Sequence, residues 1–314
     1  MSLTVGILAY NSEQALPDLL ASLPDGLAGV DDWHLVVVDG ASADGTVDLV
    51  RRTAPEATCV GLGGNRGFAA AANAAIAAFP ATGAVLILSP RVRLTPGCVK
   101  VMLDALHEPG AGIAVPRLFR GPGQPYPSLR RRPTLLRAFA EALLGGRLTR
   151  PFGALSELIA DPAGYSSDTP ADWATGAVTM MSRACVTRAG PWDESFFLYS
   201  EETEFELRAA DAGFRLAFAD VDVVHLGGES RVRPELWSLL CANRVRLYGM
   251  RHRRAPATLF WAAILLGESL RSAHAPIHRA AAGKLIRERR GIVAGRPARR
   301  PRSGIGAAGS LYRR

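Results

Sequence analysis

Two groups of charged residues have types and spacings that could do chemistry. Glu201, Glu202 and Glu204 lie within four residues at the start of a helical pattern. Crowded carboxylates can raise one another's pKa toward neutrality, where a carboxylate can accept a proton from a reacting hydroxyl. Arg91 follows an apolar run, and its planar guanidinium could pair bidentately with phosphate oxygens. The structural alternative for the acidic group is that carboxylates favour the N-terminus of a helix.

Further polar residues follow the apolar runs that we predict as buried strands. Strands are expected at residues 3–9, 34–38, 58–61 and 84–88, with helical patterns between them, and two short strands are expected later in the chain at residues 216–218 and 221–225. This alternation predicts a mainly parallel α/β sheet with helices on both faces. Ligands bind outside the carboxyl ends of such strands, which selects Tyr10, Asn11, Asp39, residues 63–67 and residues 89–93.

The motifs that carry these residues resemble one family in order along the chain. They read VGILAYNS, VVVDGASADGT, NRGFAAAAN, LILSPRVRLTPG, the block from DWATGA to SEETEFE, and VVHLGGES. From residue 3 to about residue 250 they resemble family 2 glycosyltransferases of the GT-A fold, particularly the bacterial rhamnosyltransferase-like branch. The resemblance implies a Rossmann-like GT-A sheet flanked by helices, and transfer of a sugar from a nucleotide-diphosphate donor.

For the donor, the resemblance implies nucleotide binding by Asp39, whose carboxylate could accept hydrogen bonds from a base or a ribose. Taken alone, an Asp after a strand is more often a turn or capping residue. Gly67 would allow close backbone approach near the diphosphate. The expected nucleotide-sugar-binding set is Tyr10, Asn11, Asp39, Asn65, Gly67, Ser89 and Arg91.

The chain departs from the family where a divalent metal, Mg²⁺ or Mn²⁺, is normally held by a carboxylate. Ser89 and Arg91 occupy those positions, and neither suits a hard, oxygen-rich metal site. His225 matches a histidine that completes the metal site in several relatives, so it is a degenerate candidate ligand. Two explanations stay open. Arg91 replaces the metal as the preorganised cation, without any cofactor, or the domain is inactive and serves as a scaffold or partner subunit.

For the acceptor, the resemblance implies that Glu202 is the general base, with Glu201 as the alternative. Asp193 and Glu194 are similar to family positions near the acceptor, and Trp173 could stack on a sugar ring. We therefore expect inverting transfer from a dTDP-rhamnose-like donor or a UDP-sugar. The expected acceptor is a hydroxyl of a cell-envelope glycan or of a lipid-linked sugar.

Charge divides the chain unequally. Residues 1–230 hold 18 basic and 26 acidic residues, whereas residues 231–314 hold 19 basic and 3 acidic residues. A basic C-terminal region predicts an anionic partner. We expect a membrane surface rather than nucleic acid, because no nucleic-acid-binding module accompanies the charge. The four cysteines form no CxxC motif and the first residues resemble no secretory signal, so the expected place is the cytoplasmic face of the membrane.

Three regions are expected along the chain. Residues 1–230 form the GT-A catalytic domain, residues 231–290 a helical basic region, and residues 291–314 a disordered tail with little to bury. The apolar stretch 258–270 is too short to span a bilayer. It is expected either to pack within the protein, including against a second subunit of an oligomer, or to lie at the membrane interface.

Overall fold

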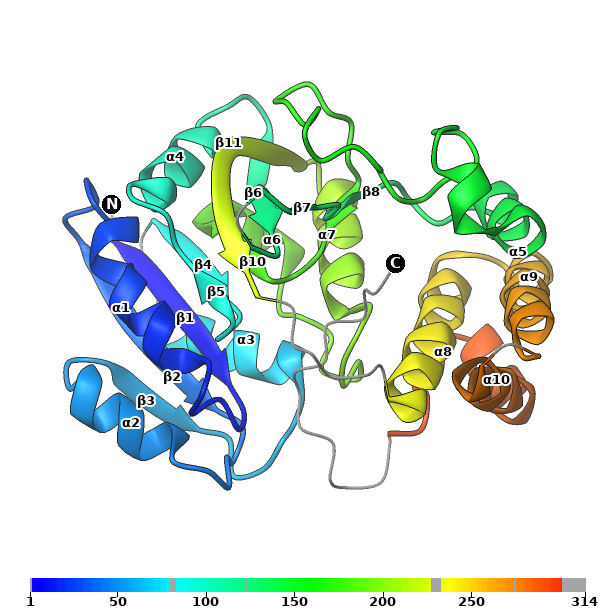
Figure 1. Cartoon of the computed structure of the whole chain (residues 1–314), viewed down its shortest axis with the longest axis horizontal. Helices are drawn as coiled ribbons and strands as arrows, with labels where there is room; N and C mark the ends of the chain where they lie inside the picture. Colours follow the sequence, from blue (N-terminus) through cyan, green and yellow to red (C-terminus); the bar gives the residue numbers. More distant parts are fainter. Residues whose placement is uncertain (1, 79–82, 122, 227–232, 274, 301–314) are drawn as a thin grey trace.

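The computed structural model describes residues 2–78, 83–121, 123–226, 233–273 and 275–300. Within them, nine strands form one sheet in the order β3-β2-β1-β4-β10-β6-β11-β5, with β7 paired to β6 (Figure 1). The strands are β1 (Leu3–Ala9), β2 (Trp33–Asp39), β3 (Thr58–Gly61), β4 (Ala84–Leu88), β5 (Val92–Arg93), β6 (Ala111–Phe119), β7 (Pro125–Tyr126), β10 (Val178–Ser182) and β11 (Arg215–His225). A second, two-stranded sheet pairs β8 (Leu129–Arg130) with β9 (Trp173–Ala174).

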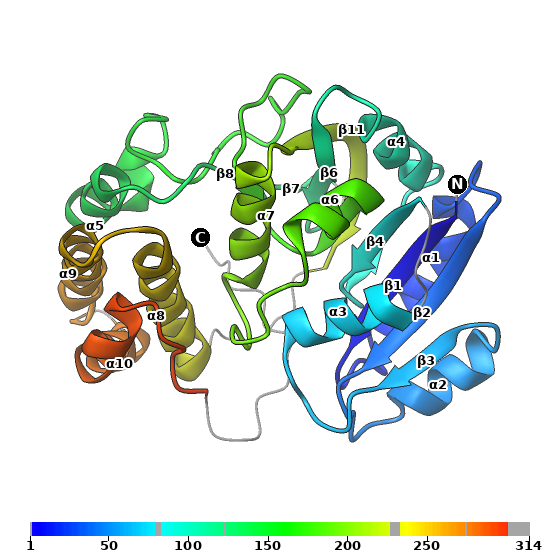
Figure 2. The same cartoon turned by 180° about the vertical axis from the view of Figure 1, so that it is seen from behind.

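The first four strands in the chain are parallel, and their side chains alternate between two cores. Val5 and Ile7 of β1 enter the core on one face, whereas Leu8 enters the core on the other. Helices α1 (Leu16–Gly26), α2 (Thr46–Thr53) and α4 (Cys98–Ala105) supply the first core. Helices α3 (Phe68–Ala78), α6 (Arg183–Ala189) and α7 (Glu201–Asp211) supply the second, as Figure 2 shows from behind. The predicted α/β class with helices on both faces is confirmed.

A separate group of helices lies beside the sheet. It consists of α5 (Leu135–Thr149), α8 (Pro234–Arg251), α9 (Arg254–Arg271) and α10 (Pro276–Val293). Their shared core contains Ala138 of α5, Val245 of α8, Phe260 of α9 and Leu285 of α10. The apolar stretch 258–270 therefore lies in a helix that packs within this group. None of the helices in the described part of the chain is both long and apolar enough to cross a membrane.

Two features differ from the prediction. Residues 216–218 and 221–225, expected as separate strands, form one strand β11 whose register against β6 shifts between Ala219 and Asp222. The region beyond residue 290 was expected to be disordered. It continues as helix to Val293, and the following residues, as far as residue 300, pack against the helical group. Ile292, Val293 and Ala298 are buried in the helical core, which is the apolar contact that the composition did not suggest. Residues 301–314 of the expected tail lie outside the described residues.

Candidate active site

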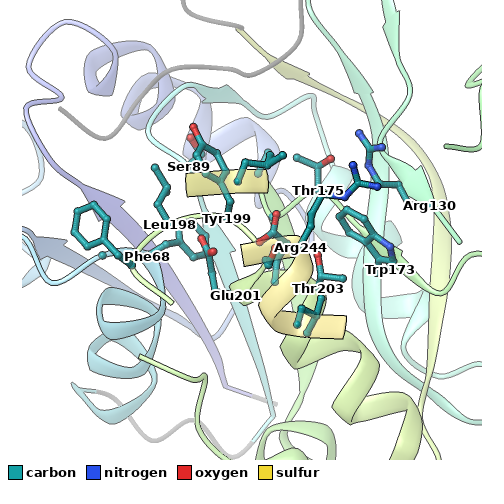
Figure 3. Close-up of a pocket in the computed structure, with 18 of the residues that line it drawn as sticks. Phe68, Ser89, Arg130, Trp173, Thr175, Leu198, Tyr199, Glu201, Thr203 and Arg244 are labelled. Carbon is teal, nitrogen blue, oxygen red and sulfur yellow. The ribbon is translucent and has the colours of Figure 1, made fainter. Parts of the chain in front are cut away.

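One pocket of about 400 Å³ brings together residues from the sheet and from the helical group. Its lining starts at the carboxyl ends of β1, β2 and β4, and reaches α7, α8 and the C-terminal end of α5. Figure 3 shows Phe68, Ser89 and Tyr199 on one side of this pocket and Arg130, Trp173 and Thr175 on the other, with Glu201 between them. This is the edge of the sheet at which the parallel strands predict a ligand.

The loop before α3 forms one wall of the pocket. Asn65 and Gly67 both line it, and the Asn65 Oδ1 atom accepts a hydrogen bond from the Gly67 N–H at 3.1 Å. Gly67 has a φ of 95°, and a Cβ there would lie 2.1 Å from the Phe197 carbonyl oxygen. Glycine is therefore required at this position, where the start of α3 contacts the segment that precedes α7.

Asp39 and Asn11 organise the neighbouring loop and do not line the pocket themselves. The Asp39 carboxylate accepts hydrogen bonds from the Ser42 N–H and hydroxyl, at 3.1 and 2.5 Å. Asn11 Oδ1 accepts a hydrogen bond from the Ala43 N–H at 2.8 Å. Their neighbours Tyr10 and Gly40 do line the pocket. The predicted nucleotide contacts of Asp39 and Asn11 stay predictions, while the structure gives both residues a role in fixing the loop.

Arg91 lies in the turn between β4 and β5, and the sheet itself fixes this turn. The Ser89 N–H donates to the Ala177 carbonyl oxygen at 2.9 Å, and the Leu226 N–H donates to the Arg91 carbonyl oxygen at 3.0 Å. The Arg91 side chain is half-buried in the pocket wall, and no ion pair engages it among the described residues. Its Nε is buried and has no hydrogen-bond partner in the part of the chain that the structure describes. Burial lowers the pKa of Arg91, yet a guanidinium stays charged at neutral pH. The pocket wall thus contains a positively charged group, the Arg91 guanidinium, to which an anionic ligand could bind.

Arg93 does not share this position. It pairs with Asp18 of α1 and is absent from the pocket lining. Alternation along an extended strand would have placed both arginines on the same side. The segment is instead a turn at Arg91 and becomes extended only at Val92, so the two side chains diverge.

His225, at the end of β11, lines the pocket with Ser89 and Arg91. Burial, together with the charges of Arg91 and Arg120, lowers the pKa of His225 to about 4, so the imidazole is neutral at pH 7. A guanidinium repels a metal cation and offers it no lone pair. The group formed by Ser89, Arg91 and His225 therefore does not fit the divalent metal that the family resemblance implies, because hard cations need several oxygen ligands.

The carboxylates Glu201 and Glu202 begin α7 after an unusual turn. Tyr199 and Ser200 have φ values of 67° and 71°, a region that costs a non-glycine residue on the order of 1–3 kcal/mol. The side chain of Asn243 on α8 holds this turn by donating to the carbonyl oxygens of Leu198 and Tyr199, at 2.9 and 3.0 Å. The helical group therefore positions the carboxylates, although it lies far away in the sequence.

The carboxyl groups of Glu201 and Glu202 are buried side by side, close enough for a hydrogen bond between them to influence the pKa of both. Burial and the adjacent charge of Glu202 raise the pKa of Glu201 well above its usual value. Burial also raises the pKa of Glu202, but the charge of Arg130 opposes that rise. The charge of Arg130 thus favours the ionised form of Glu202, whereas the charge of Glu202 favours the protonated form of Glu201. These directions agree with the predicted role of Glu202 as a base, while the assignment itself stays a prediction.

Trp173 forms the opposite wall, on β9. Its indole N–H donates to the Arg131 carbonyl oxygen at 3.1 Å, and the Arg130 guanidinium lies 5.2 Å from the ring centroid. Glu206 of α7 fixes the strand by accepting the Ala174 N–H at 2.6 Å. Trp173 is thus held rigidly in the pocket wall, and its stacking on an acceptor sugar stays a prediction.

The structure places Asp193 and Glu194 outside the pocket lining. Asp193 accepts from Ser195 and pairs with the buried Arg246 of α8 at 3.3 Å. Glu194 pairs with Arg66 at 2.6 Å and accepts from Asn73 at 3.1 Å. These contacts connect the loop before α7 to α3 and α8. They give both residues a structural role and place neither in the lining of the pocket, to which Trp173 and Glu202 belong.

Sequence reasoning missed four residues of this site. Arg130 and Arg244 line the pocket, whereas Asn243 and Glu206 support it. Arg130 belongs to the run RRR at residues 130–132, in a stretch rich in Gly, Pro and Arg whose composition is typical of a loop. The other three lie in ordinary helical patterns, and only contacts between distant segments distinguish them from surface residues.

Comparisons with known proteins find glycosyltransferases. The model for glycosyl transferase family 2 matches residues 4–156, and that for glycosyl transferase family group 2 matches residues 157–278. An N-acetylglucosaminyl-diphospho-decaprenol L-rhamnosyltransferase of Mycobacterium tuberculosis is 28% identical over 237 residues, which cover 71% of this chain and 75% of that protein.

Solved structures share the fold. The mannosyltransferase PcManGT from Pyrobaculum calidifontis, in complex with GDP-Man and Mn²⁺, is similar with a TM-score of 0.53 and 18% identity, covering 91% of this chain and 80% of that one. S. aureus TarS 1-349 in complex with UDP is similar with a TM-score of 0.51 and 16% identity, covering 93% of this chain and 90% of that one. At these identities the likeness establishes the fold alone.

Proposed function

Because the chain belongs to glycosyltransferase family 2, we propose that it transfers a sugar, with inversion, from a nucleotide-diphosphate donor to a hydroxyl of a lipid-linked or cell-envelope glycan. The donor diphosphate is bound beside Arg91, and the acceptor hydroxyl approaches between Glu202 and Trp173. Both ends belong to one pocket, which supports the proposal that donor and acceptor meet there.

The observation that carries the proposal is the unsatisfied guanidinium of Arg91. It is half-buried, its Nε has no hydrogen-bond partner, and no carboxylate forms an ion pair with it within the described residues. A buried charge without a partner is costly unless a ligand supplies the opposite charge. A diphosphate that becomes more negative as the glycosidic bond breaks is such a ligand. We therefore propose that Arg91 stabilises the leaving group and that transfer needs no metal.

At the other end, Glu202 would accept the proton of the acceptor hydroxyl as its oxygen attacks the anomeric carbon. Glu201, which keeps its own proton, donates a hydrogen bond to Glu202 and orients it. The bond between the anomeric carbon and the diphosphate oxygen breaks as the new glycosidic bond forms. Attack from the face opposite the leaving group gives inversion.

The donor and the acceptor are proposed from the similar mycobacterial protein. That protein is named for the transfer of L-rhamnose to N-acetylglucosaminyl-diphospho-decaprenol. We propose a dTDP-rhamnose-like donor, with UDP-sugars as the next choice, and a lipid-linked acceptor. Such an acceptor requires peripheral binding at the inner face of the cytoplasmic membrane, in line with the basic residues of the C-terminal region.

Thermal unfolding with a panel of nucleotide-sugars in EDTA tests the proposal. A ligand that binds only the folded state raises Tm according to its concentration relative to Kd. We expect dTDP-rhamnose to raise Tm more than UDP-sugars, and the Arg91→Ala variant to lose most of this rise. Absence of stabilisation by every donor, with and without Mn²⁺, would contradict it and favour the scaffold alternative.

A further inference from the structure

At the C-terminal end of α5, next to the part that lines the pocket, several large apolar side chains are exposed and do not belong to the pocket lining. Helical geometry breaks at Gly145, where φ is 77° and ψ is 156°. Around this break Leu143, Leu144, Leu148 and Phe152 are 63%, 50%, 65% and 60% exposed. We call residues 143–152 the α5 tip. Large apolar side chains exposed singly are ordinary, but a contiguous group of them marks an interaction site.

The α5 tip also carries two arginines, Arg147 and Arg150. Both are exposed, and neither forms an ion pair within the part of the chain that the structure describes. By contrast, most of the arginines around the rest of α5 and α8 are engaged, such as Arg132 with Asp172 and Arg244 with Glu157. Leucines interleaved with unpaired arginines match a surface that is apolar inside and anionic outside, which is the chemistry of a bilayer interface.

The α5 tip is continuous with the rim of the pocket. Gly146, Thr149 and Arg150 belong both to this segment and to the pocket lining, which continues through Leu155 and Leu158 toward Trp173. An object bound to the tip would therefore meet the acceptor end of the pocket. The helix itself is anchored to the protein, because Gly267 of α9 lies against Ala142 and Arg244 pairs with Glu141 at 3.4 Å.

We propose that the α5 tip inserts its leucines and Phe152 into an anionic lipid bilayer and thereby seats the acceptor end of the pocket on the membrane. Arg147 contacts the headgroups, and Arg150 lies where a diphosphate at the membrane surface would enter the pocket. The inference deepens the proposed function, which supplies the lipid-linked acceptor. It assigns membrane contact to α5 rather than to the C-terminal basic region alone.

Vesicle binding tests the inference without requiring turnover. The full chain is centrifuged with vesicles of equal parts phosphatidylglycerol and phosphatidylcholine, and with vesicles of phosphatidylcholine alone. The test variant is Leu144→Ser/Leu148→Ser. The control is Val101→Ser, which removes an exposed apolar side chain from α4, a helix that packs on the sheet and not in the helical group. Since the exchanged side chains are exposed, circular dichroism and Tm should match those of the wild type.

We expect the double variant to bind anionic vesicles at least about ten-fold more weakly than the wild type. Arg147→Ala should weaken binding roughly five-fold, and Val101→Ser should leave it unchanged. The double variant should keep wild-type turnover of a short, water-soluble acceptor and lose turnover of a long-chain acceptor in vesicles.

Three results would overturn the inference. They are absence of wild-type binding to anionic vesicles, equal binding by the double variant, and a wild-type dimer that the double variant converts to monomer without any vesicle binding. The last result would make the α5 tip a contact between copies. A protein that binds vesicles through the tip but transfers no sugar would refute the proposed function and leave this inference standing.

Discussion

The two ends of the pocket are supported in different ways. Arg91 lies in a turn whose backbone hydrogen bonds run to Ala177, directly before β10, and to Leu226, directly after β11, so the sheet and its flanking residues hold this turn. Glu201 and Glu202 follow a strained turn that depends on Asn243 of α8. The cation is thus held by the sheet, whereas the carboxylates are positioned by a group of helices that lies beside the sheet. Changes at the two ends should therefore have separable effects on donor binding and on proton transfer.

The largest effect is expected at the carboxylate end. Glu202→Gln removes the proposed base and should lower kcat about 10²–10⁴-fold. Donor affinity, measured by calorimetry with a nonreacting nucleotide, should remain within about two-fold, since Arg91 is untouched. Glu235→Gln, an exposed residue in the first turn of α8, is the matched control. Equal losses of donor affinity and kcat would show that the two ends are not separate.

Arg91→Ala should affect the donor end with a loss of about 10²–10³-fold in kcat/KM, because the developing diphosphate charge loses its counter-charge. Unlike Glu202→Gln, it should also weaken nucleotide-diphosphate binding, which fluorescence or calorimetric titration would measure. Arg93→Ala removes an arginine two residues away that pairs with Asp18 outside the pocket, so its kinetics should match the wild type. Wild-type kinetics for Arg91→Ala would contradict the mechanism.

Asn243→Ala should lower kcat about ten-fold with little change in donor affinity, because it releases only the turn that presents the carboxylates. Ser200→Gly should recover part of this loss, since glycine adopts a positive φ without strain. The recovery distinguishes a positioning role from general damage to α8, which a glycine at residue 200 could not repair. Steady-state kinetics of both single variants and the double variant check this.

A smaller effect concerns the pH dependence of stability. The pKa of Glu201 is higher in the folded protein than in the unfolded chain, so the folded state binds more protons between the two values. Stability from this group is present below the unfolded pKa and is lost as pH rises through the folded pKa. Glu201→Gln should therefore raise Tm by a few degrees at pH 8 and by less at pH 5. A larger rise in Tm at pH 5 than at pH 8 for Glu201→Gln would contradict this prediction.

The sequence was most informative where local pattern decides structure. The residue ranges of β1, β3 and β4 were predicted as found, because buried parallel strands appear as short apolar runs between helical patterns. The positions of Asn65, Gly67, Ser89 and Arg91 around one pocket followed from the carboxyl ends of these strands. One sequence feature was enough to locate the unusual cation: Arg91 stands where the family has a metal-binding carboxylate.

The positions of residues that are fixed by contacts with distant segments could not be predicted from local sequence patterns. Asp193 and Glu194 lie close to the carboxylates in sequence, yet Arg246, Arg66 and Asn73 hold them away from the pocket. The α5 tip has leucines on both sides of a Gly-Gly pair, so its apolar residues do not follow a helical pattern that would predict an exposed surface. Asn243 contacts a turn 44 residues earlier, and no local signal reports that.

The most direct test of the account is the metal dependence of transfer. Turnover of a dTDP-rhamnose-like donor is measured in EDTA and again after adding Mn²⁺ or Mg²⁺, for the wild type and for Arg91→Ala. With Arg91 as the cation, wild-type turnover should be the same in all conditions and should fall about 10²–10³-fold in the variant. Loss of wild-type turnover in EDTA with recovery on adding Mn²⁺ would contradict the claim that Arg91 takes the place of the metal.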